Sequence, residues 1–458
     1  MLDQSHRGSS PTARFHILRI MAALILFGAA GLHAQEKTTL TIDDALRIAF
    51  ERSPDLQLSA NDTALSVAAI EQQRASQLPN LSLSISPSER IGRGFEQTTG
   101  SIGTQATTGL GIGVSSSMTL FNGFATRNAI AEAEQNLLSS RGTLERTRQT
   151  LVFNVVTQFL QTVLDSALIG IAQDNLRAEQ DVLERVTAFT KAGKKAVSDL
   201  YGEQATVASA ELRVIQTQHD YELSRARLVN TLQLDPLVGY SFVAPAADTT
   251  APANANLDFA ALLAGIMASR PDIAAQQARV AAAAEAIKVA RAGYYPSVSV
   301  SGNVGTSYSS QNANDPFGAQ LFSNNPNASV GLSIGIPIFD RKVTQINEER
   351  AIIQRDNELL RLRTLQQQIS LDLRGAYLDY LTATKQIDVT NRQFTSAAEA
   401  LKAEQERYRV GVSTLVELSQ ARAKFLSAET DRTQAVYTLL LKGRAIEYYR
   451  GTIAQPGR

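Results

Sequence analysis

The stretch RVGVSTLVEL, residues 409–418, interrupts a sequence that otherwise has the features of one very long helix. A similar stretch, KAGKKAVSDL, lies at residues 191–200. Two pairs of residues align at the same spacing: Gly193 with Gly411, and Asp199 with Glu417. Because glycine readily adopts the positive φ that ends a helix, we predict that each glycine closes one long helix and that a returning helix follows. Ser198 and Ser413 are the candidate caps of the returning helices.

Further matches at almost the same offset indicate an internal duplication. The matched pairs of segments are ERSPDLQLSA (51–60) with ASRPDIAAQQ (268–277), QLPNLSLSIS (77–86) with YYPSVSVSGN (294–303), and TLFNGF (119–124) with PIFDRK (337–342). Every pair keeps the offset of the two glycines to within one position. Pro54 and Pro271 therefore occupy equivalent positions, and they predict a break near the start of each helical stretch. Thr41 and Asp44 have the spacing of a capping box.

The duplication predicts the domain organisation of the chain. We expect a signal peptide at residues 1–34, a first repeat at 35–235, a connecting segment at 236–256, a second repeat at 257–451 and a C-terminal tail at 452–458. Each repeat is expected to contain a helix, a strand hairpin and two long helices. Residues 124–192 and 341–410 lack proline, and each would form a helix about 100 Å long at 1.5 Å per residue.

The segment 1–34 has the features of an export signal. Basic residues precede an apolar run from residue 20 to residue 30, and Ala34 is a suitable residue for cleavage. The apolar run is too short to span a bilayer as a helix, which needs roughly 20 residues. After the signal the net charge is −2, which gives no electrostatic footprint for nucleic acid.

Composition argues against an enzyme. The chain contains no cysteine, which excludes disulfides, cysteine nucleophiles, thiolate metal sites and a lipid anchor on cysteine. His219 is the single histidine that follows residue 34, so a multi-histidine metal site is excluded. We find no phosphate-binding glycine loop and no nucleophile elbow, and we predict neither a cofactor nor a metal site.

Four segments alternate apolar residues with Ser or Gly, as strands with one apolar and one polar face do. These segments are residues 81–86, 109–120, 296–308 and 329–339. A soluble sandwich buries its apolar face, whereas a membrane barrel turns it towards lipid. The length of the strands, about 10 residues or more, and the uncharged polar face favour the barrel. Four strands cannot close a barrel, so two chains with eight strands or three with twelve are required.

Several motifs, in their order and spacing, resemble those of the TolC-type outer-membrane efflux channel family. They are ALRIAFERSPDLQ at residues 45–57, the strand entries that follow Pro79 and Pro296, LFNG, IFDR, and RYRVGVSTLVELSQA at residues 407–421. The resemblance covers nearly the whole chain after the signal. It implies an α+β membrane protein: a homotrimer with a twelve-stranded outer-membrane β-barrel, four strands per chain, continued by a long, internally duplicated periplasmic α-helical barrel.

The resemblance also implies the function. Such channels are passive export ducts of tripartite efflux or type I secretion systems, and they need no cofactor. They work with a periplasmic adaptor protein and with an inner-membrane pump or ABC exporter. Their cargo includes small molecules, metals and proteins, and the sequence does not distinguish among these. The alternative is a non-channel coiled-coil scaffold of the cell envelope, in which the strands form a small plug.

By the resemblance, the helical tips form the pore constriction. Asp199 and Glu417 match acidic positions there, and Gln420 lies where some members have a second acid. In a trimer the two acids would supply six carboxylates near one axis, a ring that attracts cations. The competing interpretation is that one or both are solvated acids at a helix start, favoured by the helix dipole.

The resemblance assigns roles to the turns as well. Gly193 and Gly411 would dock the adaptor, and Tyr408 matches a tyrosine that helps to hold the closed state. Ser413 occupies the place of the family's basic gating partner, so a charged latch is not expected at that position.

Overall fold

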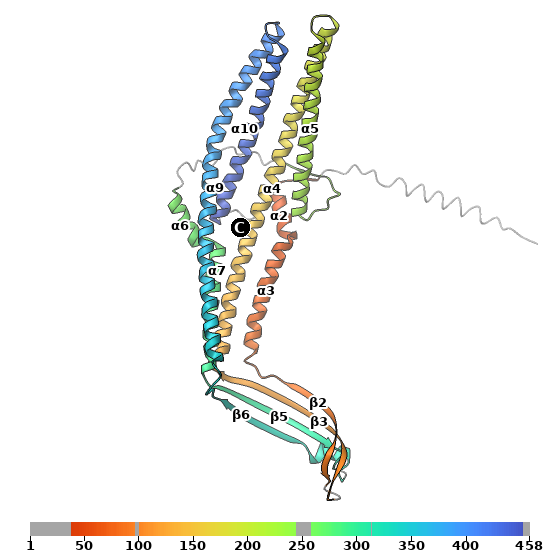
Figure 1. The fold of residues 1–458 in the computed structure, drawn as a ribbon, viewed down its shortest axis with the longest axis vertical. Helices are drawn as coiled ribbons and strands as arrows, with labels where there is room; N and C mark the ends of the chain where they lie inside the picture. The colour runs from red at the N-terminus through yellow and green to blue at the C-terminus, as the bar shows by residue number, and fades with distance from the viewer. Residues whose placement is uncertain (1–37, 97–99, 244–257, 313, 452–458) are drawn as a thin grey trace, which may run out of the picture.

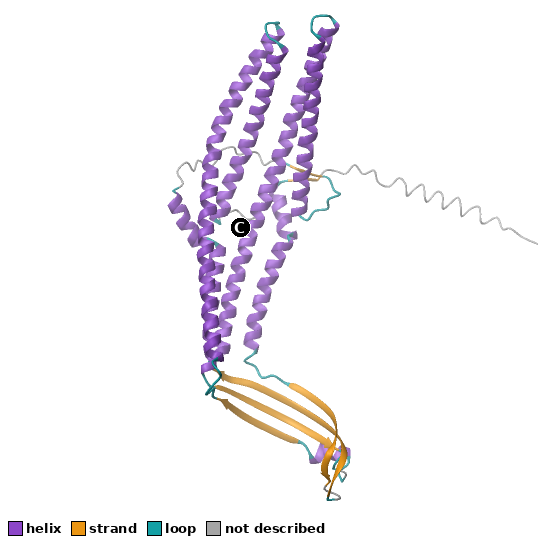
Figure 2. Cartoon of the chain, in the orientation of Figure 1, coloured by secondary structure: helices purple, strands orange, loops and turns teal. Residues whose placement is uncertain are grey.

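The computed structural model describes residues 38–96, 100–243, 258–312 and 314–451 of this elongated chain. A body of long helices carries a four-stranded sheet at one end and two helical hairpins at the other (Figure 1; Figure 2). The predicted signal peptide and C-terminal tail lie outside the described residues.

Each repeat contributes two shorter helices followed by two long ones. The first repeat contains α2 (Ile42–Arg52), α3 (Pro54–Ala75), α4 (Ala125–Lys191) and α5 (Val197–Thr231). The second contains α6 (Phe259–Ser269), α7 (Pro271–Arg291), α9 (Val343–Arg409) and α10 (Leu415–Arg450). The two predicted long helices are confirmed, since α4 and α9 have 67 residues each.

The predicted helix starts are confirmed in their physical detail. Thr41 and Asp44 form a reciprocal capping box at the start of α2. Pro54 and Pro271 are the first residues of α3 and α7. At this position a backbone N–H has no acceptor within the helix, so proline, which lacks the N–H, loses no hydrogen bond. The two prolines therefore explain the break between α2 and α3 and the break between α6 and α7.

The helices are arranged in a fixed lateral order. Near the sheet, α3 packs on α4, α4 on α7 and α7 on α9. Towards the tips, α5 packs on α4, α4 on α10 and α10 on α9. One side of the helical body is therefore bounded by α3 and α5, and the other by α9.

The main sheet is antiparallel, with the strand order β2-β3-β5-β6. Its strands are β2 (Ser82–Glu96), β3 (Ser101–Asn122), β5 (Ser297–Ser309) and β6 (Asn327–Gly335). The register aligns Leu83, Val114 and Val304 across three strands, so the apolar residues share one face. The sheet stands clear of the helical body (Figure 1). Its apolar face is exposed in the single chain, with 65% of Leu83 and 62% of Val304 accessible.

Two details of the strand prediction are wrong. The register shifts between Thr119 and Phe121, so Leu120 is an extra residue in a bulge and Phe121 continues the pairing. The last strand ends at Gly335, and Ile336 and Ile338 lie beyond it. Pro337 explains the early end, because proline has no N–H to donate to a neighbouring strand.

The short elements lie beside the helical body, at its junction with the sheet and at the far end of the sheet. β1 (Thr38–Leu40) pairs in parallel with β4 (Tyr240–Phe242) beside the helical body. β4 was not predicted, because it lies inside the segment interpreted as a connection. The remaining short elements are η1 (Ala292–Tyr294), α8 (Phe317–Ala319) and the π-helical turn η2 (Gln320–Asn324).

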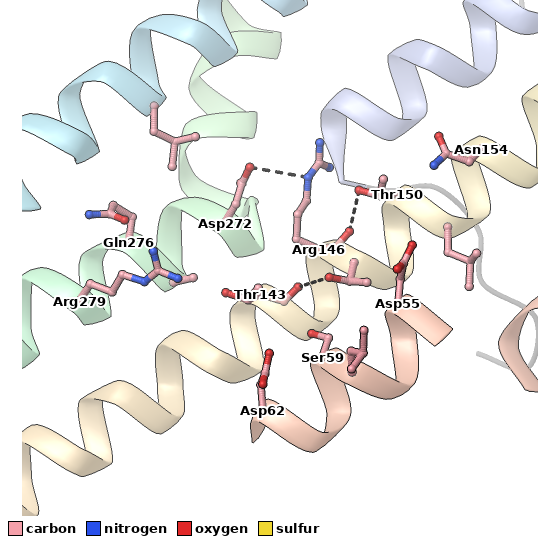
Figure 3. Close-up of a pocket in the computed structure, with 15 residues that line it drawn as sticks. Asp55, Ser59, Asp62, Thr143, Arg146, Thr150, Asn154, Asp272, Gln276 and Arg279 are labelled. Carbon is pink, nitrogen blue, oxygen red and sulfur yellow. Dashed lines mark hydrogen bonds and ion pairs between the residues drawn. The ribbon is translucent and has the colours of Figure 1, made fainter. Parts of the chain in front are cut away.

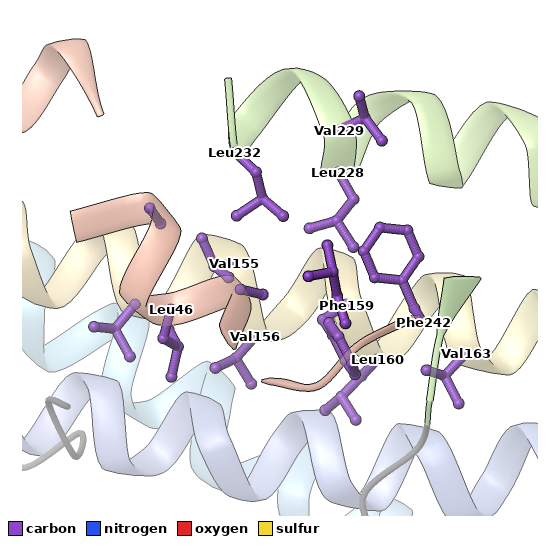
Figure 4. Packing of buried hydrophobic residues seen from close by; sticks show 14 residues of the cluster. Leu46, Val155, Val156, Phe159, Leu160, Val163, Leu228, Val229, Leu232 and Phe242 are labelled. Carbon is purple, nitrogen blue, oxygen red and sulfur yellow. The ribbon is translucent and has the colours of Figure 1, made fainter. Parts of the chain in front are cut away.

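The largest hydrophobic core lies where α2, α4, α5 and β4 meet (Figure 4). Phe159 of α4 is fully buried and contacts Phe242 edge to face, with the ring centroids 5.7 Å apart. This part of α4 is apolar and long enough to cross a bilayer by composition, but half of that window is buried. We therefore interpret it as the core segment that fixes the short elements to the long helices.

We expect Phe159→Ala to lower the thermal unfolding midpoint substantially. The change removes a fully buried ring and leaves a cavity, which typically costs about 3–5 kcal/mol. His219→Ala, on an exposed surface of α5, is the control and should leave the midpoint unchanged. Equal midpoints for the two variants, measured by circular dichroism, would contradict this assignment of the core.

Candidate gate at the helical tips

Both hairpins turn by the same hydrogen-bonded motif. Gly193 has φ +68° and Gly411 has φ +81°, so both occupy the left-handed region as predicted. At the first tip the N–H of Lys194 donates to the carbonyl of Phe189 at 2.9 Å, and at the second Val412 donates to Arg407 at 2.9 Å. This bond from the residue after the glycine closes the last turn of each long helix.

The returning helices begin differently from the prediction. The N-cap of α10 is Thr414, which forms a capping box with Glu417, and Ser413 precedes it. The N-cap of α5 is Ala196, which offers no side-chain cap, and Ser198 lies inside the first turn. The two serines are therefore not the caps. The duplicated tips share a turn but not a helix start.

Glu417 is held at the start of α10 by three donors. Its Oε2 accepts hydrogen bonds from the N–H of Thr414 at 2.8 Å, the hydroxyl of Ser413 at 2.9 Å and the hydroxyl of Thr414 at 3.0 Å. The backbone N–H of Thr414, followed by the two hydroxyls, lowers the pKa of Glu417. Glu417 therefore keeps its charge through neutral pH.

A groove of about 550 Å³ between α9 and α10 brings two of the predicted constriction residues together. Glu417 and Gln420 both line it, together with Glu404 and Lys424. The hydroxyl of Ser413 also contacts Glu404, so this serine lies between two carboxylates. With one proton to donate, Ser413 satisfies one of them at a time.

Asp199 and Tyr408 interact with each other across the two hairpins. Burial raises the pKa of Tyr408 most, and the charges of Asp199 and Glu203 raise it further. The ammonium of Lys195, in the first turn, lies 5.2 Å from the ring centroid of Tyr408. The tips thus place Asp199 beside the second hairpin, whereas Glu417 and Gln420 face the groove within that hairpin.

Sequence reasoning missed three buried charges below the tips: Glu179 of α4, Glu203 of α5 and Arg422 of α10. Glu203 is 1% exposed, and the side chains of Glu179 and Arg422 are 6% and 9% exposed. Glu203 begins a buried series on α5 that continues with Val207, Ala210 and Val214. A charged residue in the heptad spacing of a packed helix was the signal that could have revealed the cluster.

A second cavity, of about 700 Å³, lies nearer the sheet between α3, α4 and α7 (Figure 3). Asp272 pairs with two arginines there: Arg146 lies 3.6 Å away, and Arg270 donates to the same carboxylate at 2.5 and 2.9 Å. Burial alone would raise the pKa of Asp272, but the hydrogen bonds and charge of Arg270, together with the charge of Arg146, lower it. This cluster binds the start of α7 to α4.

In the part of the chain that the structure describes, no group of three or more His, Asp or Glu side chains is arranged to hold a metal ion. The polar chemistry of the tips is that of hydrogen-bonded carboxylates, which suits a gate or a cation-attracting constriction.

Comparison with known proteins identifies the family. The outer membrane efflux protein family matches the chain twice, over residues 45–232 and 262–449. The starts of the two matches, at residues 45 and 262, reproduce the offset of the internal repeat. The chain belongs to the outer membrane efflux protein family. It is an outer-membrane export channel, and the family is one of passive channels rather than enzymes.

Curated relatives cover most of this efflux protein. The pyoverdine export outer membrane protein OpmQ of Pseudomonas putida is 24% identical over 404 residues, with 86% of this chain and 82% of the relative covered. The outer membrane protein TolC of Escherichia coli is 22% identical over 446 residues, with 95% of this chain and 86% of the relative covered.

Solved structures share the fold of this efflux protein. The channel CusC superimposes with a TM-score of 0.77 at 18% identity, covering 89% of this chain and 91% of CusC. The outer-membrane channel OprN superimposes with a TM-score of 0.74 at 22% identity, covering 91% of each chain.

We expect Gly411→Ala to loosen the second tip. A left-handed conformation costs an alanine about 1–2 kcal/mol, so amide exchange at residues 408–414 should become roughly 5 to 30 times faster. Gly375→Ala is the matched control, because Gly375 lies inside α9 with open space around its Cα. Hydrogen exchange measured by mass spectrometry would contradict this account if both variants behaved alike.

Proposed function

We propose that three copies of this outer membrane efflux protein form one passive export channel. The observation that supports this most directly is the sheet, whose outer strands β2 and β6 each pair on one side within the described residues. In hydrocarbon, unpaired backbone groups at a sheet edge have no water to satisfy them. Joining β6 of one protomer to β2 of the next would close a barrel of twelve strands.

The helical body supports the same assembly. Its two lateral boundaries both carry exposed apolar side chains, which a neighbouring protomer would cover. On one boundary these are Leu58, Leu65, Leu212 and Ile215 of α3 and α5, and on the other Ile353, Leu360, Leu371 and Leu378 of α9. Three such layers side by side would form a helical tunnel that continues the barrel.

The position of the two hairpins, at the end of the molecule opposite the sheet, indicates which partner proteins the channel would contact. We infer that the two hairpins reach into the periplasm, where the turns at Gly193 and Gly411 would meet an adaptor protein linked to an inner-membrane pump or ABC exporter. Relatives are named for export of pyoverdine and for efflux of antibiotics and toluene, which favours small molecules as cargo. Metals and proteins stay open as alternatives.

We retain the five-part division of the chain, with export directed by residues 1–34, as part of this proposal. The scaffold alternative is not favoured, because a relative that matches 93% of this chain, BepC of Brucella suis, is named an outer membrane efflux protein.

The assembly is tested by native mass spectrometry of the detergent-extracted protein. We expect a trimer that survives extraction, and extraction should require detergent. A stable monomer, or release from washed membranes by salt alone, would overturn the proposal.

A pair of neighbouring substitutions on β6 tests which face meets lipid. Leu332→Arg places a charge on the apolar face and should reduce barrel insertion, since arginine in the membrane midplane costs about 2–4 kcal/mol. Ser333→Arg places the same residue on the polar face and should be tolerated, with a change in channel conductance. Heat-modifiable mobility of membrane trimers reports insertion, and equal loss in both variants would contradict a barrel.

The constriction is tested by Glu417→Gln. This change removes a charge but keeps an oxygen that accepts hydrogen bonds from Thr414, so the helix cap survives. We expect a lower cation conductance and a weaker block by divalent cations in planar bilayers. Glu406→Gln, at an exposed acid of the same tip that pairs with Arg409, is the control. Unchanged conductance and block in Glu417→Gln would remove this residue from the pore.

A further inference from the structure

The buried charges below the tips join the two hairpins. Arg422 of the second hairpin donates to a carboxylate oxygen of Glu179 at 2.9 Å and to the carbonyl oxygen of Ala178 at 3.1 Å, both on the first hairpin. Glu203, also on the first hairpin, interacts electrostatically with both Glu179 and Arg422. Counted at 1.5 Å per residue from the helix ends that adjoin the turns, Glu203 and Arg422 lie roughly 10 Å below the tips and Glu179 roughly 18 Å below them.

The cluster has two carboxyl groups for one guanidinium. Arg422 is engaged by Glu179, and Oε1 of Glu203 has no hydrogen-bond partner in the described structure. Burial, and then the charge of Glu179 and hydrogen bonding to it, raise the pKa of Glu203 to about 7. When packed, the cluster is neutral overall with one proton on Glu203, and it carries a net negative charge without that proton.

The groups around Glu203 do not supply a second positive charge at close range. On its own helix lies Asp199, and from α9 Tyr408 presents a buried hydroxyl without a hydrogen-bond partner among the described residues. On α4, Arg185 is exposed and donates to the carbonyl of Asp181 at 3.1 Å. Lys195 lies against the ring of Tyr408 in the first turn.

We propose that Glu179, Glu203 and Arg422 form a proton-dependent latch, which holds the two hairpins of a protomer together when Glu203 is protonated and loosens them when it ionises. These residues position the tips and do not line the constriction. The role of this latch in gating rests on the proposed channel function, whereas the latch itself is a property of the single chain.

The direction of the pH effect follows from the balance at Glu203. Ionised Glu203 is attracted to Arg422, but burial and Glu179 outweigh that attraction. When the hairpins separate, water reaches the carboxylate of Glu203, and both its burial and its repulsion by Glu179 decrease. The closed form therefore binds a proton more tightly than the open form, and closure weakens as pH rises towards 7. If the open form has the ordinary glutamate value of 4.5, the ratio of open to closed grows about thirty-fold between pH 5.5 and 8.

Fluorescence quenching between the tips tests the latch. The chain contains neither cysteine nor tryptophan, so Lys194→Cys labelled with bimane and Arg409→Trp form a unique probe pair. Both positions are exposed and adjoin the contact between Lys195 and Tyr408, so the latch stays intact. Quenching in the detergent-solubilised protein should fall as pH rises from 5.5 to 8.

Two variants in this labelled background decide the outcome. Glu203→Gln imitates the protonated side chain and should keep strong quenching at every pH. Glu211→Gln, at an exposed acid on the same helix, should follow the parent protein. Quenching that does not change with pH in the parent, or an unchanged transition in Glu203→Gln, would overturn the latch.

Planar-bilayer recordings of the otherwise native chain separate the latch from the channel. We expect open probability to rise with pH in the parent and to stay at its low-pH level in Glu203→Gln. A pH-dependent quenching signal with no ion conductance in any variant would contradict the channel function and leave the latch standing. Conductance with the same pH response in both proteins would show that the latch does not gate the channel.

Discussion

Unpaired backbone groups at the edges of the four-stranded sheet are the constraint on which the rest of this structure depends. The long helices leave the apolar face of the sheet exposed, and its outer strands β2 and β6 each pair on one side within the part of the chain that the structure describes. Water satisfies such edges in a soluble protein, but hydrocarbon does not. A chain that places this sheet in a membrane must therefore share it with other copies. The lateral order of the helices and the apolar residues on both boundaries of the helical body are consistent with that requirement.

The duplication gives the chain the equal helix lengths that the proposed assembly would need. A tunnel needs walls of equal height around its axis, and α4 and α9 have equal lengths of 67 residues. Each is ended by a glycine with positive φ and by the same hydrogen bond across the turn. Two equivalent hairpins per chain thus reach the same distance from the sheet. The tips differ at the start of the returning helix, since α10 begins with a capping box formed by Thr414 and Glu417 and α5 begins without one.

Charge in the core of the helical body is the feature that ordinary packing does not explain. Apolar or small residues occupy most of the buried positions between α4, α5 and α10, yet Glu179, Glu203 and Arg422 lie among them. A buried ion pair contributes little net stability compared with well-packed apolar residues, because the cost of removing the charges from water offsets their attraction. An additional buried carboxylate increases that cost. Such a cluster suits an interface that must open, because its two states differ in hydration and in protonation. The acids at the tips are exposed, so a change in their protonation does not depend on whether the helices stay packed.

The sequence alone determined the long helices, the main strands, their order and their repetition. Proline at residues 54 and 271, glycine at residues 193 and 411 and the alternation of the strands all act through local backbone geometry, which a sequence expresses directly. It also limited the chemistry, since a chain without cysteine has no thiolate sites.

Only the tertiary structure decided which side chains meet. Thr414 rather than Ser413 caps α10, since the cap depends on where the turn releases the chain. Strand β4 forms only because β1, distant in sequence, lies beside it. Glu203 and Arg422 belong to different repeats, and the heptad spacing of Glu203 indicates a packed position without showing which residue it meets. Their burial and shared electrostatics arise from the packing of α4 against α10, and this long-range contact is the information that local sequence patterns do not contain.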